Sequence, residues 1–153
     1  MSKIHETISE NVRFIRFKDD NISQEKFANK LRVSKTSIFE IETGEFNCSF
    51  SLLDSIARHY NFFIGDLFRD DFISRYHSNK TGTYLESSMI VFRDNVTSKL
   101  KDDLKFKSSL YSTNAQSTTI SNIFTGNGNP KINAYIAIAN QLNAPLASLF
   151  ERS

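Results

Sequence analysis

Residues 24–68 read QEKFANKLRVSKTSIFEIETGEFNCSFSLLDSIARHYNFFIGDLF, and residues 106–150 read FKSSLYSTNAQSTTISNIFTGNGNPKINAYIAIANQLNAPLASLF. When the first stretch is shifted by 82 positions onto the second, identical residues recur between Thr36 and Phe68. Most of them are apolar residues at helical spacing or glycines that can close a turn. The repeat therefore predicts two similar helical units in one chain.

The composition is that of folded domains. The chain has 153 residues, of which 39% are hydrophobic and 12% aromatic, and this is enough to build packed cores. Its single cysteine, Cys48, cannot form an intramolecular disulfide, and no apolar run is long enough for a signal peptide or a membrane span. We therefore expect a cytoplasmic protein that does not enter a membrane.

Charge is divided unevenly along the chain. Residues 1–69 carry ten basic and ten acidic residues, whereas residues 89–153 carry seven basic and four acidic ones. The formal net charge of the whole chain is +2. Lysines that simply face solvent would give the second half the same small surplus of basic residues. Charge alone therefore does not identify a nucleic-acid partner.

The first unit contains two short helices separated by a turn. Ser23 can cap a helix with Phe27 and Leu31 on one face, and Ser34 can cap the next helix, which ends at Gly44. A final turn over residues 64–68 completes five expected helices. Apolar stripes predict the two outer helices, and the residues of these stripes are Ile8, Val12, Ile15, Leu52, Leu53, Ile56 and Ala57.

One pattern in this unit resembles a known family. Residues Gln24 to Gly44 follow Q-x-x-F-A-x-x-L-x-V-S-x-x-x-I-x-x-I-E-x-G. This pattern is similar to the helix-turn-helix of the lambda-repressor-like (Xre/Cro) regulators, and the flanking helices extend the similarity to residues 5–69. The family often has glycine where Arg32 stands. The resemblance implies a five-helix domain that binds double-stranded DNA.

The resemblance also implies roles for individual residues. Residues 35–42 would form the recognition helix, whose N-terminal residues enter the major groove while the preceding helix lies across the phosphates. Gln24 would contact a phosphate from a helix N-terminus. The expected DNA-binding residues of the first domain are Gln24, Ser34, Lys35, Thr36, Ser37, Phe39 and Glu40.

The second unit keeps the end of this pattern and departs from its beginning. Ile120 and Ile123 lie on the counterpart of the recognition helix, and Gly126 follows that helix. Upstream, Phe106 or Lys107 stands where the glutamine would be. We expect a degenerate helix-turn-helix that contacts DNA. The alternative is a helix-turn-helix fold reused for dimerisation or for binding another protein.

The candidate DNA contacts of the second unit are polar or basic. Its recognition helix bears hydroxyl and amide groups and no acidic residue, the loop that follows could touch the DNA backbone, and lysines precede it. These candidates are Lys105, Lys107, Ser117, Thr118, Thr119, Ser121, Asn122, Asn127, Asn129 and Lys131.

We expect a domain at residues 1–69, a turn-rich linker at residues 70–86 and a second domain at residues 87–153. In the first helix of the second domain, Ile90 and Val91 lie off the apolar stripe that faces inward. Such surplus apolar surface packs against a neighbouring domain or against a second copy of the chain. The residues of the stripe itself are Met89, Phe92, Val96 and Leu100.

The sequence contains no recognisable catalytic or metal-binding pattern. Gly126-Asn127-Gly128 lacks the lysine and hydroxyl of a phosphate loop, and no nucleophile with a base and an orienting group can be nominated. The histidines and the cysteine, which are His5, His59, His77 and Cys48, do not have metal-ligand spacing. We expect neither an enzyme nor a cofactor or metal.

These observations predict an all-α fold of two tandem five-helix lambda-repressor-like helix-turn-helix domains joined by a short linker. The expected function is that of a sequence-specific DNA-binding transcription repressor. A homodimer is expected, with Phe62, Phe63 and Ile64 or their counterparts at the dimer contact. The alternative is a protein-binding inhibitor, such as an antitoxin or a phage-encoded antagonist of host defence, that uses its helix-turn-helix for autoregulation.

Overall fold

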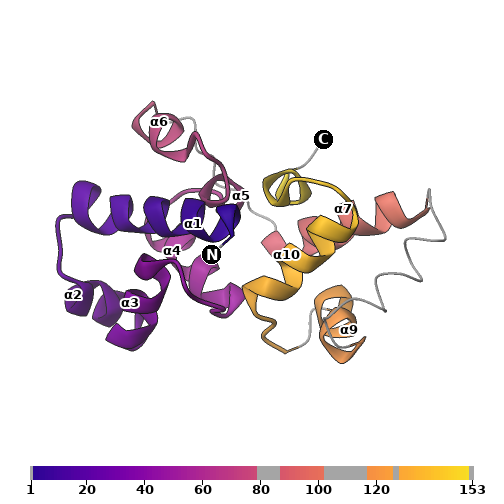
Figure 1. Ribbon diagram of the computed structural model, residues 1–153, viewed down its shortest axis with the longest axis horizontal. Helices are drawn as coiled ribbons and strands as arrows, with labels where there is room; N and C mark the ends of the chain where they lie inside the picture. The colour runs from indigo at the N-terminus through magenta and orange to yellow at the C-terminus, as the bar shows by residue number, and fades with distance from the viewer. Residues whose placement is uncertain (1, 79–86, 102–116, 126–127, 152–153) are drawn as a thin grey trace. The chain divides into compact units, whose positions relative to one another are not determined.

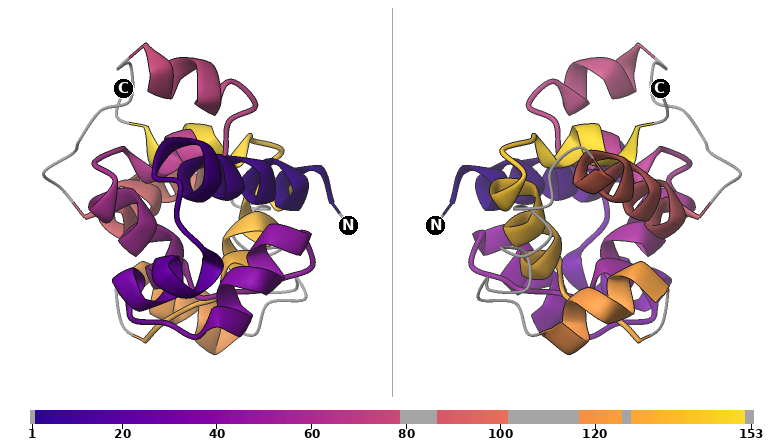
Figure 2. Two further views of the ribbon diagram at one scale, coloured as in Figure 1. Left: turned by 90° about the vertical axis from the view of Figure 1, so that its left-hand side faces the viewer. Right: turned by 90° about the vertical axis from the view of Figure 1, so that its right-hand side faces the viewer.

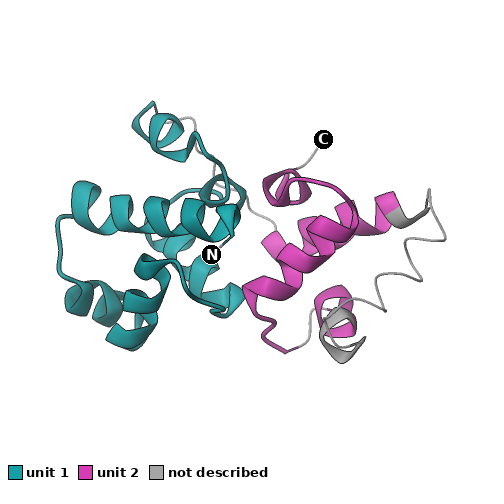
Figure 3. Ribbon diagram, viewed as in Figure 1, with its two compact units in different colours: residues 1–83 teal, residues 84–153 magenta. Residues whose placement is uncertain are grey.

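The computed structural model describes residues 2–78, 87–101, 117–125 and 128–151. Regular secondary structure in these residues is helical, which confirms the all-α prediction (Figure 1). The chain divides into two compact units, residues 1–83 and residues 84–153, here called unit 1 and unit 2 (Figure 3). Within the described ranges, no helix combines the length and apolar character needed to cross a membrane.

Unit 1 consists of helices packed around an apolar core. Figure 2 shows the helices of the chain from two further sides. In chain order they are α1 (Lys3–Arg13), the π-helix η1 (Phe14–Asp19), α2 (Gln24–Leu31), α3 (Lys35–Thr43), α4 (Phe50–His59), α5 (Ile64–Leu67) and α6 (Phe72–His77). Helix α3 packs against α1 and α2. The fully buried side chains of this core include Ile8, Val12, Ile15, Phe27, Ile38, Ile41, Leu53 and Ile56.

Short polar residues start the central helices. Ser23 Oγ accepts a hydrogen bond from Lys26 N at 3.1 Å, and Ser34 Oγ accepts one from Ser37 N at 3.1 Å. Each serine thereby satisfies an N–H group that has no partner within its helix. The same residue types that signalled helix starts in the sequence therefore cap α2 and α3.

Two residues with positive φ end these helices. Arg32 follows α2 with φ of 59°, and Val33 N donates to Ala28 O at 3.0 Å to close the turn. Gly44 follows α3 with φ of 86°. Glycine adopts this region without strain, whereas a residue with a Cβ atom does so at a cost. The turn between α2 and α3 therefore carries strain at Arg32, whose backbone lies in the left-handed region.

The end of the first helix is a π-helix that the helical spacing of the sequence did not predict. Asp20 N donates to Ile15 O at 3.0 Å, five residues back, as a π turn requires. Asp20 Oδ2 accepts from Tyr60 Oη at 2.5 Å and from Lys30 Nζ at 2.9 Å. Asp19 Oδ2 accepts from Tyr76 Oη at 2.7 Å. Side chains from α2, from α6 and from the residue that follows α4 thus hold the end of η1 in place.

Part of the segment expected to be linker forms helix α6. Phe72 is fully buried, and its ring lies 5.1 Å from the ring of Phe62 and 5.5 Å from that of Tyr76, measured between centroids. Arg75 Nη2 lies 3.3 Å from Asp66 Oδ1. Residues 72–77 therefore belong to the packed part of unit 1, while residues 79–86 lie outside the described residues.

The expected dimer contact of unit 1 is buried within the chain. Phe62, Phe63 and Ile64 are 4%, 5% and 1% exposed. Helix α6 accounts for part of this burial, because Phe72 packs edge-on against Phe62. These side chains do not form an open apolar surface.

Unit 2 contains helices α7 (Ser88–Lys101), α9 (Ser117–Thr125) and α10 (Ile132–Gln141) and the 3-10 helix η2 (Leu146–Phe150). The ring of Phe92 lies 4.9 Å from that of Tyr135 and 5.0 Å from that of Phe150. Val91, which was expected to lie off the inward stripe of α7, is fully buried, whereas Ile90 is 40% exposed.

One side-chain clamp occurs in both units. Asn11 Nδ2 on α1 donates to Leu67 O at 2.9 Å and to Arg69 O at 3.1 Å. The corresponding bonds of unit 2 are 2.8 Å and 2.9 Å long. They run from the side-chain amide on α7 to two carbonyl groups at the end of η2, and the residues are Asn95, Leu149 and Glu151. In each unit, an asparagine on the first helix holds the end of a short helix, which is α5 in unit 1 and η2 in unit 2.

The turn before each of these short helices is also repeated. Phe62 N donates to Ala57 O at 2.9 Å, and Ala144 N donates to Ala139 O at 3.0 Å. The residue before each donor, Asn61 or Asn143, has positive φ, at 57° and 52°. An asparagine in the left-handed region is a common way to end a helix. The turns that lead into α5 and into η2 therefore share backbone geometry as well as apolar pattern.

Candidate nucleic-acid interface

Helix α3 has one buried face and one exposed face. Ile38, Ile41 and Glu42 are buried. Residues on a helix repeat their direction every three to four positions, so the opposite face is formed by a different set. Its members are the exposed residues Lys35, Thr36, Phe39, Glu40 and Thr43. This face, which we call the α3 face, contains four of the sequence-predicted DNA-binding residues.

Two other predicted residues hold the start of α3. Ser34 Oγ and Ser37 Oγ lie 2.9 Å apart, in addition to the capping bond from Ser37 N. Ser37 is half-buried, whereas Ser34 is exposed. Both hydroxyl groups are engaged in the local hydrogen-bond arrangement, so they fix the first turn of α3 beside the α3 face.

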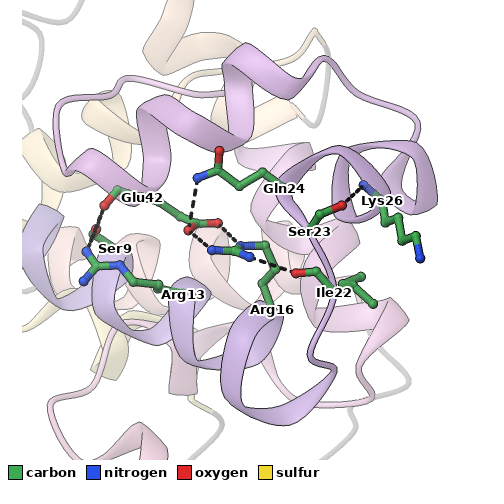
Figure 4. Close-up of polar contacts among 8 residues, drawn as sticks. All are labelled: Ser9, Arg13, Arg16, Ile22, Ser23, Gln24, Lys26 and Glu42. Atoms are coloured by element: carbon green, nitrogen blue, oxygen red, sulfur yellow. Dashed lines mark hydrogen bonds and ion pairs between the residues drawn. The ribbon is translucent and has the colours of Figure 1, made fainter.

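The carboxylate of Glu42 joins three parts of unit 1 (Figure 4). It accepts two hydrogen bonds from Arg16, from Nε to Oε2 at 2.6 Å and from Nη2 to Oε1 at 2.8 Å. Gln24 Nε2 donates to Glu42 Oε1 at 3.3 Å, and Arg16 Nη1 donates to Ile22 O at 2.8 Å. The side chains of Arg16 and Glu42 are only 12% and 5% exposed. A buried pair with this number of hydrogen bonds fixes geometry strongly.

The backbone of Glu42 is also bound to α1. Ser9 Oγ and Arg13 Nη2 each donate to Glu42 O at 2.8 Å. This carbonyl lies in the last turn of α3, where the helix leaves its acceptors without partners. Helix α3 is therefore fixed at its start by a serine cap and at its end by α1.

Sequence reasoning did not identify the Arg16–Glu42 pair. A signal for it existed, because Glu42 follows Ile41 on the side of α3 that faces the core. A carboxylate in such a position requires a partner. The partner could not be named, since it lies 26 residues away in sequence on η1.

Gln24 stands at the first position of α2, as predicted. Its side chain is half-buried and is oriented by the bond to Glu42. The first N–H groups of a helix lack acceptors within the helix and attract anions. The structure thus places Gln24 at a helix N-terminus that is linked through Glu42 to α3.

The pKa values near η1 are shifted by its hydrogen bonds. The bond from Tyr60, followed by that from Lys30, lowers the pKa of Asp20. Burial, and then the bond to Asp20, raises the pKa of Tyr60. Burial and the bond to Asp19 raise the pKa of Tyr76. Asp20 is therefore ionised and both tyrosines are neutral around neutral pH.

The histidines and the cysteine lie apart in local contacts. The ring of His5 lies 5.0 Å from that of Phe46, and the ring of His77 lies 5.2 Å from that of Phe14. Burial raises the pKa of the Cys48 thiol to about 12, so the thiol stays protonated at neutral pH. Among the residues that the structure describes, no three metal-ligating side chains gather in one place.

The predicted contacts of unit 2 are only partly described. Ser117, Thr118 and Thr119 belong to α9, but their side chains lie outside the described part of the chain. Lys105, Lys107 and Asn127 also lie outside the described residues. Three of the remaining candidates are exposed, and these are Ser121, Asn129 and Lys131.

Asn122 has a structural contact. Its side chain is half-buried, and Nδ2 would lie 3.0 Å from a Cβ atom built on Gly128, which has φ of 73°. The amide of Asn122 therefore packs against the loop that follows α9.

Comparison with known proteins identifies one region. A protein-family model described as helix-turn-helix matches residues 17–62, from within η1 to just beyond α4. This region is a helix-turn-helix of the Xre or lambda-repressor-like type, which occurs in DNA-binding regulators. No curated protein and no solved structure matches the chain.

Proposed function

We propose that the protein is a sequence-specific DNA-binding transcription repressor whose α3 face reads bases in the major groove. The observation that carries this proposal is the exposed face of a helix fixed at both ends, within the region that matches the helix-turn-helix family. A helix held in this way loses little conformational freedom when it enters a groove, and such preorganisation favours affinity. Occupation of promoter DNA would then block transcription.

Contacts to phosphate and to bases would come from different elements. Lys35 and Thr36, at the start of α3, would reach base edges, because the N-terminal end of the recognition helix enters the groove. Gln24 and the first N–H groups of α2 would bind a phosphate and set the register. The bond from Gln24 to Glu42 supports this arrangement, since it links the phosphate-binding end of α2 to α3.

We also propose that unit 2 is a degenerate second helix-turn-helix domain that contacts DNA. The repeated asparagine clamp and the repeated turn before α5 and before η2 support a common origin of the two units. The surplus of basic residues in positions 89–153 supports contact with phosphates. Two half-sites about one helical turn apart need two readers, and a homodimer would supply two copies of α3.

Selection of bound sequences from a random pool of duplexes tests the function directly. We expect enrichment of one operator, and affinity for it well above that for random DNA at the same salt concentration. The Lys35→Ala/Thr36→Ala variant should lose the specific excess. Glu10→Ala, an exposed change on α1 away from the α3 face, is the matched control and should retain it.

Two results would contradict the proposal. One is a selection that enriches no sequence, which would favour the alternative of a protein-binding inhibitor. The other is an operator whose specific binding survives the double substitution in α3. The number of chains bound to one operator, measured by analytical ultracentrifugation, tests the homodimer separately.

A further inference from the structure

Phe39 is the large apolar side chain of the α3 face, and packing within the fold does not explain why its ring is exposed. It is 55% exposed, more than Phe17, Ile73 and Ile90, which are the other large apolar side chains described as exposed. Phe17 has cationic neighbours, with the Arg16 guanidinium 5.8 Å and the Lys18 ammonium 5.4 Å from its ring centroid. An aromatic ring left in water gains nothing from the hydrophobic effect until a partner covers it.

The position of Phe39 on α3 restricts what this partner can be. Lys35 lies four residues before it and Thr36 three residues before it, so the three side chains project from the same side of the helix. Ile38, the preceding residue, points into the core instead. A ligand that covers Phe39 therefore also touches the hydroxyl and the ammonium group beside it.

Among base edges in the major groove, thymine alone offers an apolar group, its C5-methyl, to an incoming side chain. We propose that Phe39 is a specificity-determining residue that packs on the C5-methyl of a thymine in each half-site. This inference rests on the proposed function, since it requires α3 in the major groove. Removal of water from the ring and from the methyl group would favour thymine over cytosine at that position.

Replacement of thymine by deoxyuridine tests this contact, because it removes the methyl group and keeps the base pair. Each thymine of the selected operator is replaced in turn, in both half-sites, and the affinity is measured by fluorescence anisotropy. For the unmodified protein we expect a loss of roughly three- to tenfold at one thymine of each half-site, and little change elsewhere.

Variants of Phe39 show whether that methyl group meets this ring. Phe39→Ala should bind the unmodified operator more weakly and respond no further to deoxyuridine at the same thymine. Such non-additivity marks two groups in contact. Glu10→Ala, an exposed change on α1, is the control, and it should keep the full response to deoxyuridine. Because Phe39 is exposed, its replacement should leave the melting temperature unchanged.

The possible outcomes distinguish failure of thymine recognition by Phe39 from failure of the proposed DNA binding. If Phe39→Ala and the unmodified protein lose equal affinity at every deoxyuridine position, Phe39 does not read thymine, although DNA binding stands. If Phe39→Ala binds the operator normally but dissociates into monomers, the ring is a contact between copies of the chain, and the inference is wrong. A selection that enriches no operator overturns both.

Discussion

Gly44 occupies a backbone position where a Cβ atom is unfavourable. Its φ of 86° ends α3 in the left-handed region. We expect Gly44→Ala to lower the free energy of unfolding by about 1–2 kcal/mol, because an L-residue is strained there. Arg32, with φ of 59°, is the opposite case, and Arg32→Gly should be neutral or stabilise by up to about 1 kcal/mol. Urea unfolding of both variants measures the change in the free energy of unfolding that each substitution causes. Equal destabilisation by the two substitutions would contradict the strain argument.

Glu42 should be among the residues least tolerant of truncation. Glu42→Ala leaves the Arg16 guanidinium, only 12% exposed, without its carboxylate, and such losses cost about 3–5 kcal/mol. The matched control is Arg58→Ala, which removes an ion pair to Asp54 from a side chain that is 75% exposed and should cost less than about 1 kcal/mol. Chemical denaturation measures the free energy of unfolding of the two variants. Similar costs for the two variants would show that the buried pair does not hold α3.

What the sequence allowed us to predict about single residues depended on how local the cause is. Ser23, Ser34 and Gly44 act on backbone groups within a few residues, so their roles followed from the sequence. The pairing of Arg16 with Glu42 depends on the fold that brings η1 to α3, and it was missed. Ser37 was expected to face bases, but its contact with Ser34 became visible only with the geometry of the first turn.

At the scale of the elements, η1 depends on tyrosine hydrogen bonds that alkaline pH should break. The folded structure raises the pKa of Tyr60 and Tyr76 above the ordinary value of 10.0. Neutral tyrosine is thus favoured in the folded state, and this contribution to stability is complete below pH about 10 and is lost as pH rises further.

The measurement is the free energy of unfolding between pH 8 and pH about 11. The unmodified protein should become less stable toward the upper limit. The Tyr60→Phe/Tyr76→Phe variant should be less stable at pH 8, where Asp19 and Asp20 have lost a donor, and should show a weaker dependence on pH. An equally steep decline in the variant would mean that other groups cause it.

Helix periodicity predicted most of the elements but neither η1 nor α6. A π turn differs from an α-helix by a single hydrogen-bond shift, and here it is supported by Tyr60 and Tyr76, which lie far along the chain. Helix α6 is short, and its place depends on the packing of Phe72 against Phe62. Isolated helices of this length are unstable in water, so tertiary contacts decide whether they form.

At the scale of the whole molecule, the asparagine clamps predict that each unit can be weakened separately. Asn11→Ala removes the donor to two carbonyl groups at the end of α5, and Asn95→Ala does the same at the end of η2. Each loss should cost about 1–3 kcal/mol, because a buried or partly buried carbonyl group, that of Leu67 or Leu149, loses its side-chain donor.

Amide hydrogen exchange read by mass spectrometry distinguishes the two effects. Asn11→Ala should speed exchange in α1 and α5, and Asn95→Ala in α7 and η2. The two variants serve as controls for each other, since the same substitution removes the corresponding clamp in each unit. If either variant accelerates exchange equally in both units, the units do not open independently.

The rate at which the partly buried thiol of Cys48 is labelled should report how often the helix-turn-helix opens. Thiolate is the reactive form, and burial raises the pKa of this thiol to about 12. A disulfide reagent should therefore react slowly until the segment between α3 and α4 opens. The chain has one cysteine, and the labelling rate therefore follows unit 1 alone. DNA bound to α3 would favour the closed state by mass action and slow the labelling. The sulfur atom of Cys48 would thus report whether DNA is bound to α3, and no probe would have to be added to the α3 face.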